Sequence, residues 1–431
     1  MTVGTSAGLH VAIVGGGITG VILALGLEKR GVSYTLYERA PAFTEIGAGI
    51  GFSPNAERAL KVVDPRVYEV YKKVASSTDD EDYFQWVDGY STNEIIARLL
   101  IGIDAFQGGR RSDFLEAWST LIPGEKVRFR KELVSALQKE DGRVALKFKD
   151  ESLDEADIVI GCDGIRSRVR QLILGEANPA SYPRYTNKFC FRALIPMDKA
   201  RKVLDETRIE RRFMYNGPGA HAITYGVANG TLLNALFVVT DPNPWPLERH
   251  TTPGTKQEVV DAYADWHPVI RGLVDLLPEK LDKWAIFDMY DHPAPCYNVG
   301  AVALAGDAAH ASGPHLGSGA GFGVEDGLVL ASVLQAADEV VRANKTGKAK
   351  VQISHDALTA YNTMRFDRDQ WLPGATREAV DLFQWMSKDV DRNDHEKYLS
   401  RVSVLYHTIW DNDIDEMVKT AVAEFNSVVA K

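Results

Sequence analysis

A glycine-rich turn near the beginning of the chain limits the possible folds more than any other segment. The apolar run of residues 9–14 leads into Gly15-Gly16-Gly17-Ile18-Thr19-Gly20, and a helical pattern follows and ends at Gly31. The next segment, residues 33–38, has the composition of a strand and ends in a carboxylate. A strand, a glycine-rich turn, a helix and a second strand in this order predict a βαβ unit within an α/β fold.

Each glycine of this motif has its own physical use. Gly15 permits the tight turn, Gly17 leaves room for a pyrophosphate, and Gly20 lets the helix pack closely on the strand. The helix N-terminus offers unpaired N–H groups to phosphates, and Glu38 would accept hydrogen bonds from an adenosine ribose. The alternative is a purely structural turn, with Glu38 as a solvated charge. The motif alone does not distinguish NAD from FAD.

A second motif lies in residues 157–170. An apolar strand pattern ends in Gly161-Cys162-Asp163-Gly164, and arginines follow at alternate positions, Arg166, Arg168 and Arg170. In a chain with a net charge of −10, this local basic segment suggests a rim that binds an anionic cofactor. The alternative is a surface loop whose arginines pair with carboxylates.

A third motif occurs late in the chain. Leu304-Ala305-Gly306-Asp307 places a carboxylate at the end of a strand pattern, and the glycine-rich residues 317–323 precede a helix expected over about residues 324–341. The carboxylate suits a polyol, and the helix N-terminus suits an anion. Together with the first motif, this indicates one long cofactor held at both ends; the alternative is a pair of structural turns. His310 is either a hydrogen-bonded structural residue or a catalytic one.

Composition excludes several classes of protein. The 49 Lys and Arg residues are outnumbered by 59 Asp and Glu residues, and no basic block stands out, which argues against a nucleic-acid partner. The longest apolar runs are far shorter than the roughly 20 residues that cross a bilayer, and residues 1–9 lack a secretory pattern. Three widely spaced cysteines predict neither a disulfide framework nor a metal site. We therefore expect a cytoplasmic protein without a metal site or membrane span.

Together the three motifs resemble those of the group A flavoprotein aromatic hydroxylases, which include the para-hydroxybenzoate and salicylate hydroxylases. The motifs occur in that family's order, and the likeness covers most of the chain. The resemblance implies FAD as cofactor and NADH or NADPH as cosubstrate, without a separate nicotinamide domain. It also links Asp163 to the binding of both FAD and NAD(P)H.

The alternation of patterns predicts how these motifs are organised. Residues 80–90 and 188–240 are rich in β-branched and aromatic residues, which favours an antiparallel sheet, and from about residue 354 the pattern is helical. We expect an α/β fold in which a Rossmann-like FAD-binding domain contains an inserted sheet-rich substrate domain and is followed by a helical C-terminal tail. The expected ranges are 1–75, 100–180 and 285–350 for the FAD-binding domain, 76–99 and 181–284 for the substrate domain, and 351–431 for the C-terminal region.

The resemblance also assigns cofactor contacts to individual residues. It implies that Asp307 binds the ribityl chain of the flavin and that Ala320, with its glycine neighbours, holds the pyrimidine edge of the flavin ring. Residues 45–51 resemble a flavin-contacting loop that includes Gly51. Residues 110–115 resemble a helix start whose arginine, here Arg111, is a ligand of the cofactor.

Within that family the chain is most similar to fungal polyketide-pathway monooxygenases that act on phenols and resorcinol aldehydes. Residues 189–195 resemble the strand that carries the substrate-binding arginine, here Arg192, and residues 222–229 resemble the strand that carries its tyrosine partner, here Tyr225. Arg192 would stabilise a phenolate or carboxylate, and Tyr225 would orient the ring. Pattern alone favours a snorkelling arginine and an interface aromatic. Further pocket candidates, for most of which packing is the simpler interpretation, are Pro314, His221, Trp86 and Trp245.

The resulting hypothesis is a monooxygenase that hydroxylates a phenolic ring through a flavin C4a-hydroperoxide, using NAD(P)H and O2. The expected substrate is a salicylate-like or polyketide-derived resorcinol aldehyde or acid. Hydroxylation would be ortho, decarboxylative, or ipso with dearomatisation. One alternative is a flavin oxidase or dehydrogenase built on the same FAD frame. Another is a dinucleotide-binding sensor that has lost catalysis.

Overall fold

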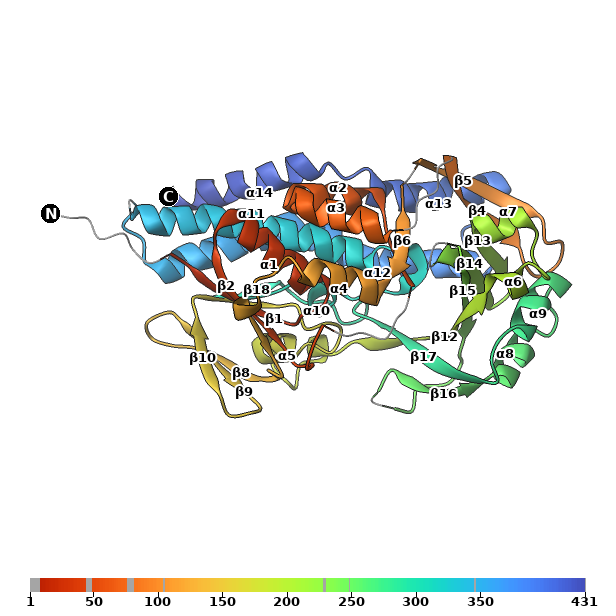
Figure 1. Cartoon of the computed structure of the whole chain (residues 1–431), viewed down its shortest axis with the longest axis horizontal. Helices are drawn as coiled ribbons and strands as arrows, with labels where there is room; N and C mark the ends of the chain where they lie inside the picture. The colour runs from red at the N-terminus through yellow and green to blue at the C-terminus, as the bar shows by residue number, and fades with distance from the viewer. Residues whose placement is uncertain are drawn as a thin grey trace.

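A computed structural model shows two sheets joined by long helices (Figure 1). One sheet lies around β1 and α1, and the other lies around β12 and β15, further along the molecule's long axis. The structure describes residues 8–43, 49–75, 81–103, 105–227, 230–247, 249–344 and 346–430. No helix in these ranges is long and apolar enough to span a membrane.

The βαβ unit expected from the glycine-rich turn forms the centre of a six-stranded sheet. β1 (His10–Val14) pairs in parallel with β2 (Ser33–Glu38), and α1 (Ile18–Arg30) connects them. On its other side β1 pairs in parallel with β11 (Ile158–Gly161). The order is β18-β19-β11-β1-β2-β7, in which the remaining strands are β18 (Asn298–Val299), β19 (Val302–Leu304) and β7 (Val127–Phe129). The predicted Rossmann-like α/β fold is confirmed.

Parallel pairing explains why the three motifs meet although they are far apart in the sequence. β11 pairs in parallel with both β1 and β19, so the carboxyl ends of these strands lie at one edge of the sheet. The glycine-rich turn, the Cys162–Gly164 segment and Asp307 each follow one of these strands. Ligands of open α/β sheets bind at such an edge.

A layer of helices packs against this sheet (Figure 1). α11 (Gly319–Ala343) begins earlier than the pattern predicted, because residues 319–323 are themselves helical. It crosses α1 closely: a Cβ on Gly26 would lie 2.8 Å from the Cβ of Ala331. The other helices of this layer are α2 (Pro54–Val63), α3 (Pro65–Val74), α4 (Arg111–Ser119), α12 (Lys350–Phe383) and α14 (Ile414–Val429).

A small antiparallel sheet and α5 (Arg168–Leu174) lie on the side of the six-stranded sheet away from this layer (Figure 1). The strand order of this small sheet is β10-β9-β8, and the sheet lies below β1 in Figure 1. Its strands are β8 (Leu133–Gln138), β9 (Val144–Phe148) and β10 (Leu153–Ala156).

The second large sheet has eight strands and is mainly antiparallel. Its order is β16-β17-β12-β15-β14-β13-β4-β5, and only β13 and β4 pair in parallel. Its strands are β4 (Glu81–Asp88), β5 (Ile95–Ile103), β12 (Arg184–Pro196), β13 (Arg212–Gly217), β14 (Ala220–Val227), β15 (Leu232–Thr240), β16 (Thr251–Thr255) and β17 (Lys280–Asp288). The three-part domain division remains a prediction; β5 and β17 cross its boundaries at residues 99/100 and 284/285.

The two faces of the eight-stranded sheet differ in what covers them. Alternate residues such as Phe191 and Phe237 belong to an apolar core, which includes residues of α8 (Lys256–Ala262) and α9 (Pro268–Asp275). Because side chains alternate along a strand, Arg192 and Leu236 lie on the opposite face. The short helices α6 (Met197–Ala200) and α7 (Glu206–Glu210) flank β12 and β13.

The C-terminal helices connect the two sheets. α13 (His395–Trp410) packs near β5, and an aromatic cluster joins Trp86 to Phe383, Tyr398 and Tyr406. Trp86 is fully buried in this core. Trp245 packs against Tyr185 of β12. Both tryptophans therefore serve packing, and neither lines the cavity described below.

Candidate active site

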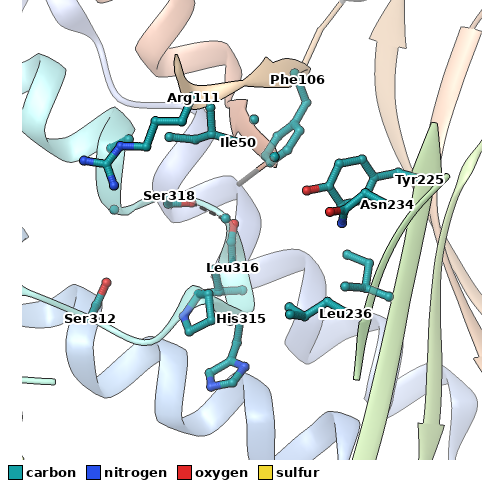
Figure 2. Close-up of a pocket in the computed structure, with 18 of the residues that line it drawn as sticks. Ile50, Phe106, Arg111, Tyr225, Asn234, Leu236, Ser312, His315, Leu316 and Ser318 are labelled. Atoms are coloured by element: carbon teal, nitrogen blue, oxygen red, sulfur yellow. Dashed lines mark hydrogen bonds between the residues drawn. The ribbon is translucent and has the colours of Figure 1, made fainter. Parts of the chain in front are cut away.

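A cavity of about 360 Å³ lies between the carboxyl ends of β1, β11 and β19 and the face of the eight-stranded sheet that carries Arg192 and Leu236. Its sheet side includes Arg192, Tyr225 and Leu236, and its opposite side includes Gly17 and Asp307. In Figure 2, Tyr225 and Leu236 lie on the sheet side of the cavity and Arg111 lies on the opposite side. The cavity therefore joins the predicted cofactor residues to the predicted substrate residues.

The glycines of the first motif have two structural roles: Gly15 and Gly20 pack closely against backbone atoms, and Gly17 faces the cavity. Gly15 has φ +110°, and a Cβ there would lie 2.4 Å from the carbonyl oxygen of Cys162. A Cβ on Gly20 would lie 2.0 Å from the carbonyl oxygen of Gly15. Gly17 lines the cavity, and a Cβ there would meet only Arg111, at 3.7 Å. No side chain caps the N-terminus of α1, so its N–H groups are available to an anion.

Glu38 lies behind this turn rather than in the cavity. Its two carboxylate oxygens accept hydrogen bonds from the backbone N–H groups of Gly16 and Ala40, both at 2.7 Å. These bonds fix the carboxylate at the end of β2, next to the glycine-rich turn. Each oxygen retains a lone pair that could accept from a ribose hydroxyl. The contact between Glu38 and the adenosine ribose therefore stays a prediction.

The third motif faces the cavity from the other side. Gly306 has φ +60°, and its N–H donates to Asp326 at 2.7 Å. Asp307, the first residue of α10 (Asp307–His310), is exposed and lines the cavity. Pro314 and Ala320 also line it, and no side chain caps the N-terminus of α11. A second free helix N-terminus is thus directed at the same space as the first.

The antiparallel ribbon of β3 (Gly49–Phe52) and β6 (Gln107–Arg110) forms the upper border of the cavity in Figure 2. Gly51 and Arg111 both line the cavity. Residues 45–48 of the predicted flavin loop lie outside the described residues, as do residues 228–229 of the predicted tyrosine strand.

Asp163 caps a helix next to the cavity, and its link to FAD and NAD(P)H stays a prediction. Its carboxylate accepts hydrogen bonds from the Ser167 hydroxyl and from the backbone N–H groups of Arg168 and Val169, so it caps α5. Burial raises the pKa of Asp163, and these hydrogen bonds oppose that effect. Cys162 and Gly164, the residues on either side of Asp163, line the cavity.

The arginines after Asp163 do not form the expected rim. Arg168 pairs with Glu176, and Arg170 is buried and donates to the carbonyls of Ala308 and Ala309. Neither these two nor Arg166 is among the residues that line the cavity. The pattern was misinterpreted because alternating arginines in a turn and short helix point in different directions. Among the described lining residues the arginines are Arg111, Arg192 and Arg212.

Cross-strand pairing assembles the sheet side of the cavity. Tyr225 pairs with Asn234, and Arg192 and Ile223 both pair with Leu236. Directly paired residues share a face of the sheet, so these five side chains form one surface, which we call the substrate wall. Burial raises the pKa of Tyr225, and the charges of Arg192 and Arg212 partly offset that rise. A guanidinium and a phenol therefore flank an apolar patch.

The sequence pattern did not single out two residues of this region: Asn234 of the substrate wall and Arg212, which also lines the cavity. Arg212 pairs with the buried Asp82 and donates to the carbonyl of Phe106 at 2.7 Å. Burial lowers the pKa of Arg212 to about 10. Asn234 is almost fully buried, and its Oδ1 has no hydrogen-bond partner among the described residues. A signal for Asn234 was present, because it is the one amide in the otherwise apolar residues 232–239.

His221 does not line the cavity. It is buried on the same face of β14 as Ile223 and Tyr225 but further along the strand. Its ring centroid lies 5.4 Å from that of His315 and 5.6 Å from that of Phe383. His315 does line the cavity. Burial lowers the pKa of His221, and it lowers the pKa of His315 to about 3, so both imidazoles are neutral near pH 7.

His310 belongs to a buried charged network beneath Asp307. Its Nε2 lies 2.7 Å from Asp326, and Arg365 donates to Asp326 and Asp369. The ligand atoms of His310, Asp326 and Asp369 lie within 4.8 Å of one another, but both carboxylates already form ion pairs with the Arg365 guanidinium. This favours the structural interpretation of His310.

Known proteins and families similar to this chain are described as FAD-binding, as monooxygenases or as hydroxylases. A model of a family described as "FAD binding domain" matches residues 112–346. The FAD-dependent monooxygenase orf3 of Aspergillus niger is 45% identical over 435 residues, which cover 98% of each chain. The salicylate hydroxylase asL1 of Sarocladium schorii is 40% identical and covers 97% of this chain and 91% of its own. A solved salicylate hydroxylase substrate complex has a TM-score of 0.84 at 29% identity and covers 96% of this chain and 98% of its own.

Proposed function

Because this chain belongs to the FAD-binding-domain family and is an FAD-dependent monooxygenase of the salicylate hydroxylase type, we propose that it hydroxylates a phenolic ring that binds against the substrate wall. The proposed substrate is a salicylate-like compound or a resorcinol aldehyde or acid. The observation that carries the proposal is the shared sheet face of Arg192 and Tyr225, opposite Asp307 and Pro314 across one cavity.

The residues of the cavity fit FAD. Gly17 leaves space beside the N-terminus of α1, while the exposed Asp307 and the N-terminus of α11 offer a carboxylate and N–H groups further along the cavity. A long anionic dinucleotide with a polyol chain suits this donor and acceptor set. When bound and reduced by NADH or NADPH, FAD supplies an electrophilic oxygen atom derived from O2.

The substrate wall supplies what an electrophilic hydroxylation needs from the protein. A phenolate ring is richer in electrons than a phenol, and the Arg192 guanidinium stabilises the phenolate oxygen or an adjacent carboxylate by charge-assisted hydrogen bonds. The Tyr225 hydroxyl adds a donor that fixes the orientation of the ring. Leu236 and Ile223 provide an apolar surface for it. Closure of this space around the ring also excludes water from the reacting atoms.

The proposal is tested by incubating the yellow holoprotein with NADH or NADPH and either salicylate or an alkylated resorcinol aldehyde. Substrate-dependent loss of NAD(P)H and a product one oxygen heavier, with or without loss of CO2, are expected. The product mass and its ultraviolet spectrum separate ortho, decarboxylative and dearomatising outcomes. Flavin reduction by substrate without NAD(P)H would instead indicate an oxidase or dehydrogenase, and the absence of any oxygenated product from either class would contradict the substrate proposal.

A further inference from the structure

The Asn234 amide is an unexplained polar group on the substrate wall. Only 2% of the Asn234 residue is exposed, and its Oδ1 is buried without a hydrogen-bond partner among the described residues. A buried acceptor without a donor costs about 1 to 3 kcal/mol, and most such groups in native proteins are paired. A donor that arrives with the ligand would pair this oxygen.

The position of Asn234 directs the amide at the cavity. It pairs across the sheet with Tyr225, and Figure 2 shows the Tyr225 hydroxyl and the Asn234 amide side by side at the same wall. The β3–β6 ribbon approaches this pair closely: a Cβ on Gly49 would lie 3.0 Å from the Tyr225 hydroxyl and 3.4 Å from the Asn234 Oδ1. The amide thus lies between the sheet and the β3–β6 ribbon.

Asn234 and Arg192 lie on the same sheet face as diagonal neighbours, because Arg192 pairs with Leu236, two residues along β15. The Cβ atoms of diagonal neighbours are about 7 Å apart. A benzene ring with two hydroxyl groups in a meta relation spans such a gap, with one oxygen toward each side chain.

We infer that Asn234 is a specificity-determining residue that accepts a hydrogen bond from a second, un-ionised hydroxyl of the ring. The inference rests on the proposed function, in the form in which Arg192 binds the phenolate oxygen rather than an adjacent carboxylate. A phenolate oxygen has no proton to donate to Asn234, and the single hydroxyl of salicylate is the one that Arg192 engages. The orphaned Oδ1 therefore selects dihydroxylated rings of the resorcinol type over monohydroxylated ones.

The test compares resorcylaldehyde with salicylaldehyde, which differ by one hydroxyl group. Dissociation constants come from the perturbation of the flavin absorbance in the oxidised holoprotein, and kcat/KM comes from product formation with NAD(P)H. Wild type should bind resorcylaldehyde roughly tenfold more tightly, the value of one buried hydrogen bond. Asn234→Leu, which has the same number and branching of side-chain heavy atoms but no hydrogen-bond acceptor, should reduce this preference to near unity.

Leu236→Val provides the matched control, because it alters the same wall without changing its polar groups. It should shift the affinities for both compounds alike and preserve their ratio. Flavin content and thermal unfolding of each variant report folding, and the ratio for wild type alone tests the inference if Asn234→Leu does not fold. Intrinsic ring reactivity cancels when ratios are compared between variants.

The outcomes separate the inference from the proposed function. An unchanged preference in Asn234→Leu, or a wild type that binds both compounds equally, overturns the role of Asn234 while phenol hydroxylation stands. A wild type that oxygenates no phenol overturns the proposed function and the inference together.

Discussion

Removal of the Arg192 guanidinium tests the substrate wall at the scale of one residue. Arg192→Ala should lower kcat/KM for phenolic substrates by roughly 30-fold, because a charge-assisted hydrogen bond contributes about 2 kcal/mol. FAD content should not change, since Arg192 lies on the sheet side of the cavity. Steady-state kinetics and the flavin absorbance of the purified variant measure the two quantities.

Two further variants sharpen this prediction. Arg192→Lys keeps the charge but loses the planar pair of donors, so its kcat/KM should fall between wild type and Arg192→Ala. Tyr225→Phe should lower turnover with little loss of flavin. If Arg192→Ala keeps both the substrate affinity and the turnover of wild type, Arg192 does not bind substrate.

The buried His310 should make stability depend on pH. Burial disfavours its charge, but Asp369 and Asp326 outweigh burial and raise the pKa of His310 to about 9. The unfolded value is near 6.5, so the stabilising contribution is complete below pH 6.5 and is lost as the pH rises through 9. The free energy of unfolding should fall by up to about 3 kcal/mol over that range, as measured by urea unfolding at several pH values.

The His310→Gln variant should have a flatter profile in the same window. His395→Gln, at the exposed start of α13, is the matched control and should keep the wild-type profile. Parallel profiles for wild type and His310→Gln would show that the alkaline loss of stability has another source.

At the residue scale, site residues that belong to a sequence motif could be predicted from the pattern, whereas site residues brought together by strand pairing could not. Gly17 and Asp307 follow strands in recognisable motifs, and both line the cavity. Arg192 and Tyr225 came from family resemblance, because a single arginine or tyrosine on a strand has many packing explanations. Asn234 was missed because its meaning depends on the cross-strand partner that places it beside Tyr225.

At the scale of elements, the crossing of α1 and α11 sets the distance between the two helix N-termini at the cavity. Gly26→Ala would bring two Cβ atoms to 2.8 Å, and the Ala331 methyl has no rotamer by which to move away. Overpacking costs about 1 to 3 kcal/mol, which exceeds the gain of up to about 1 kcal/mol from replacing a helical glycine. Gly26→Ala should therefore lower the free energy of unfolding by about 1 kcal/mol in urea unfolding.

A double-mutant cycle gives the control for this crossing. Ala331→Gly in the Gly26→Ala background removes the clash and should recover part of the lost stability, so the two changes should not be additive. Additive effects would mean that the helices relax apart without cost.

Element boundaries were predictable where a local rule applied. The βαβ unit followed from its glycines, and α1 ends at the predicted Gly31, which adopts the left-handed conformation. The start of α11 was placed too late because glycines usually weaken a helix, whereas here Gly323 and Gly327 are helical and pack against Thr19 and Leu23. Tertiary contact therefore overrode local propensity.

At the scale of the whole molecule, one cavity collects residues from most of the chain. Gly17, Arg111 and Asp307 come from three distant segments, and Tyr406 reaches the cavity from α13. The chain pattern predicted an interrupted nucleotide-binding unit, but it could not show that the C-terminal helices pack against both sheets. That contact depends on aromatic side chains whose partners are more than 300 residues away, such as Trp86 and Tyr406.

This arrangement makes FAD a link between distant segments, so cofactor binding should stabilise the whole chain. A ligand at 100 times its dissociation constant stabilises the native state by about 2.7 kcal/mol. Wild type should therefore unfold at a higher temperature with excess FAD than after removal of FAD. Asp307→Ala should show a smaller FAD-dependent shift, because it weakens cofactor binding, but nearly the same Tm without FAD, because Asp307 is exposed. Asp307→Asn, which keeps a hydrogen-bonding group, should lie between them, and an equal shift in all three proteins would show that Asp307 does not contact the cofactor.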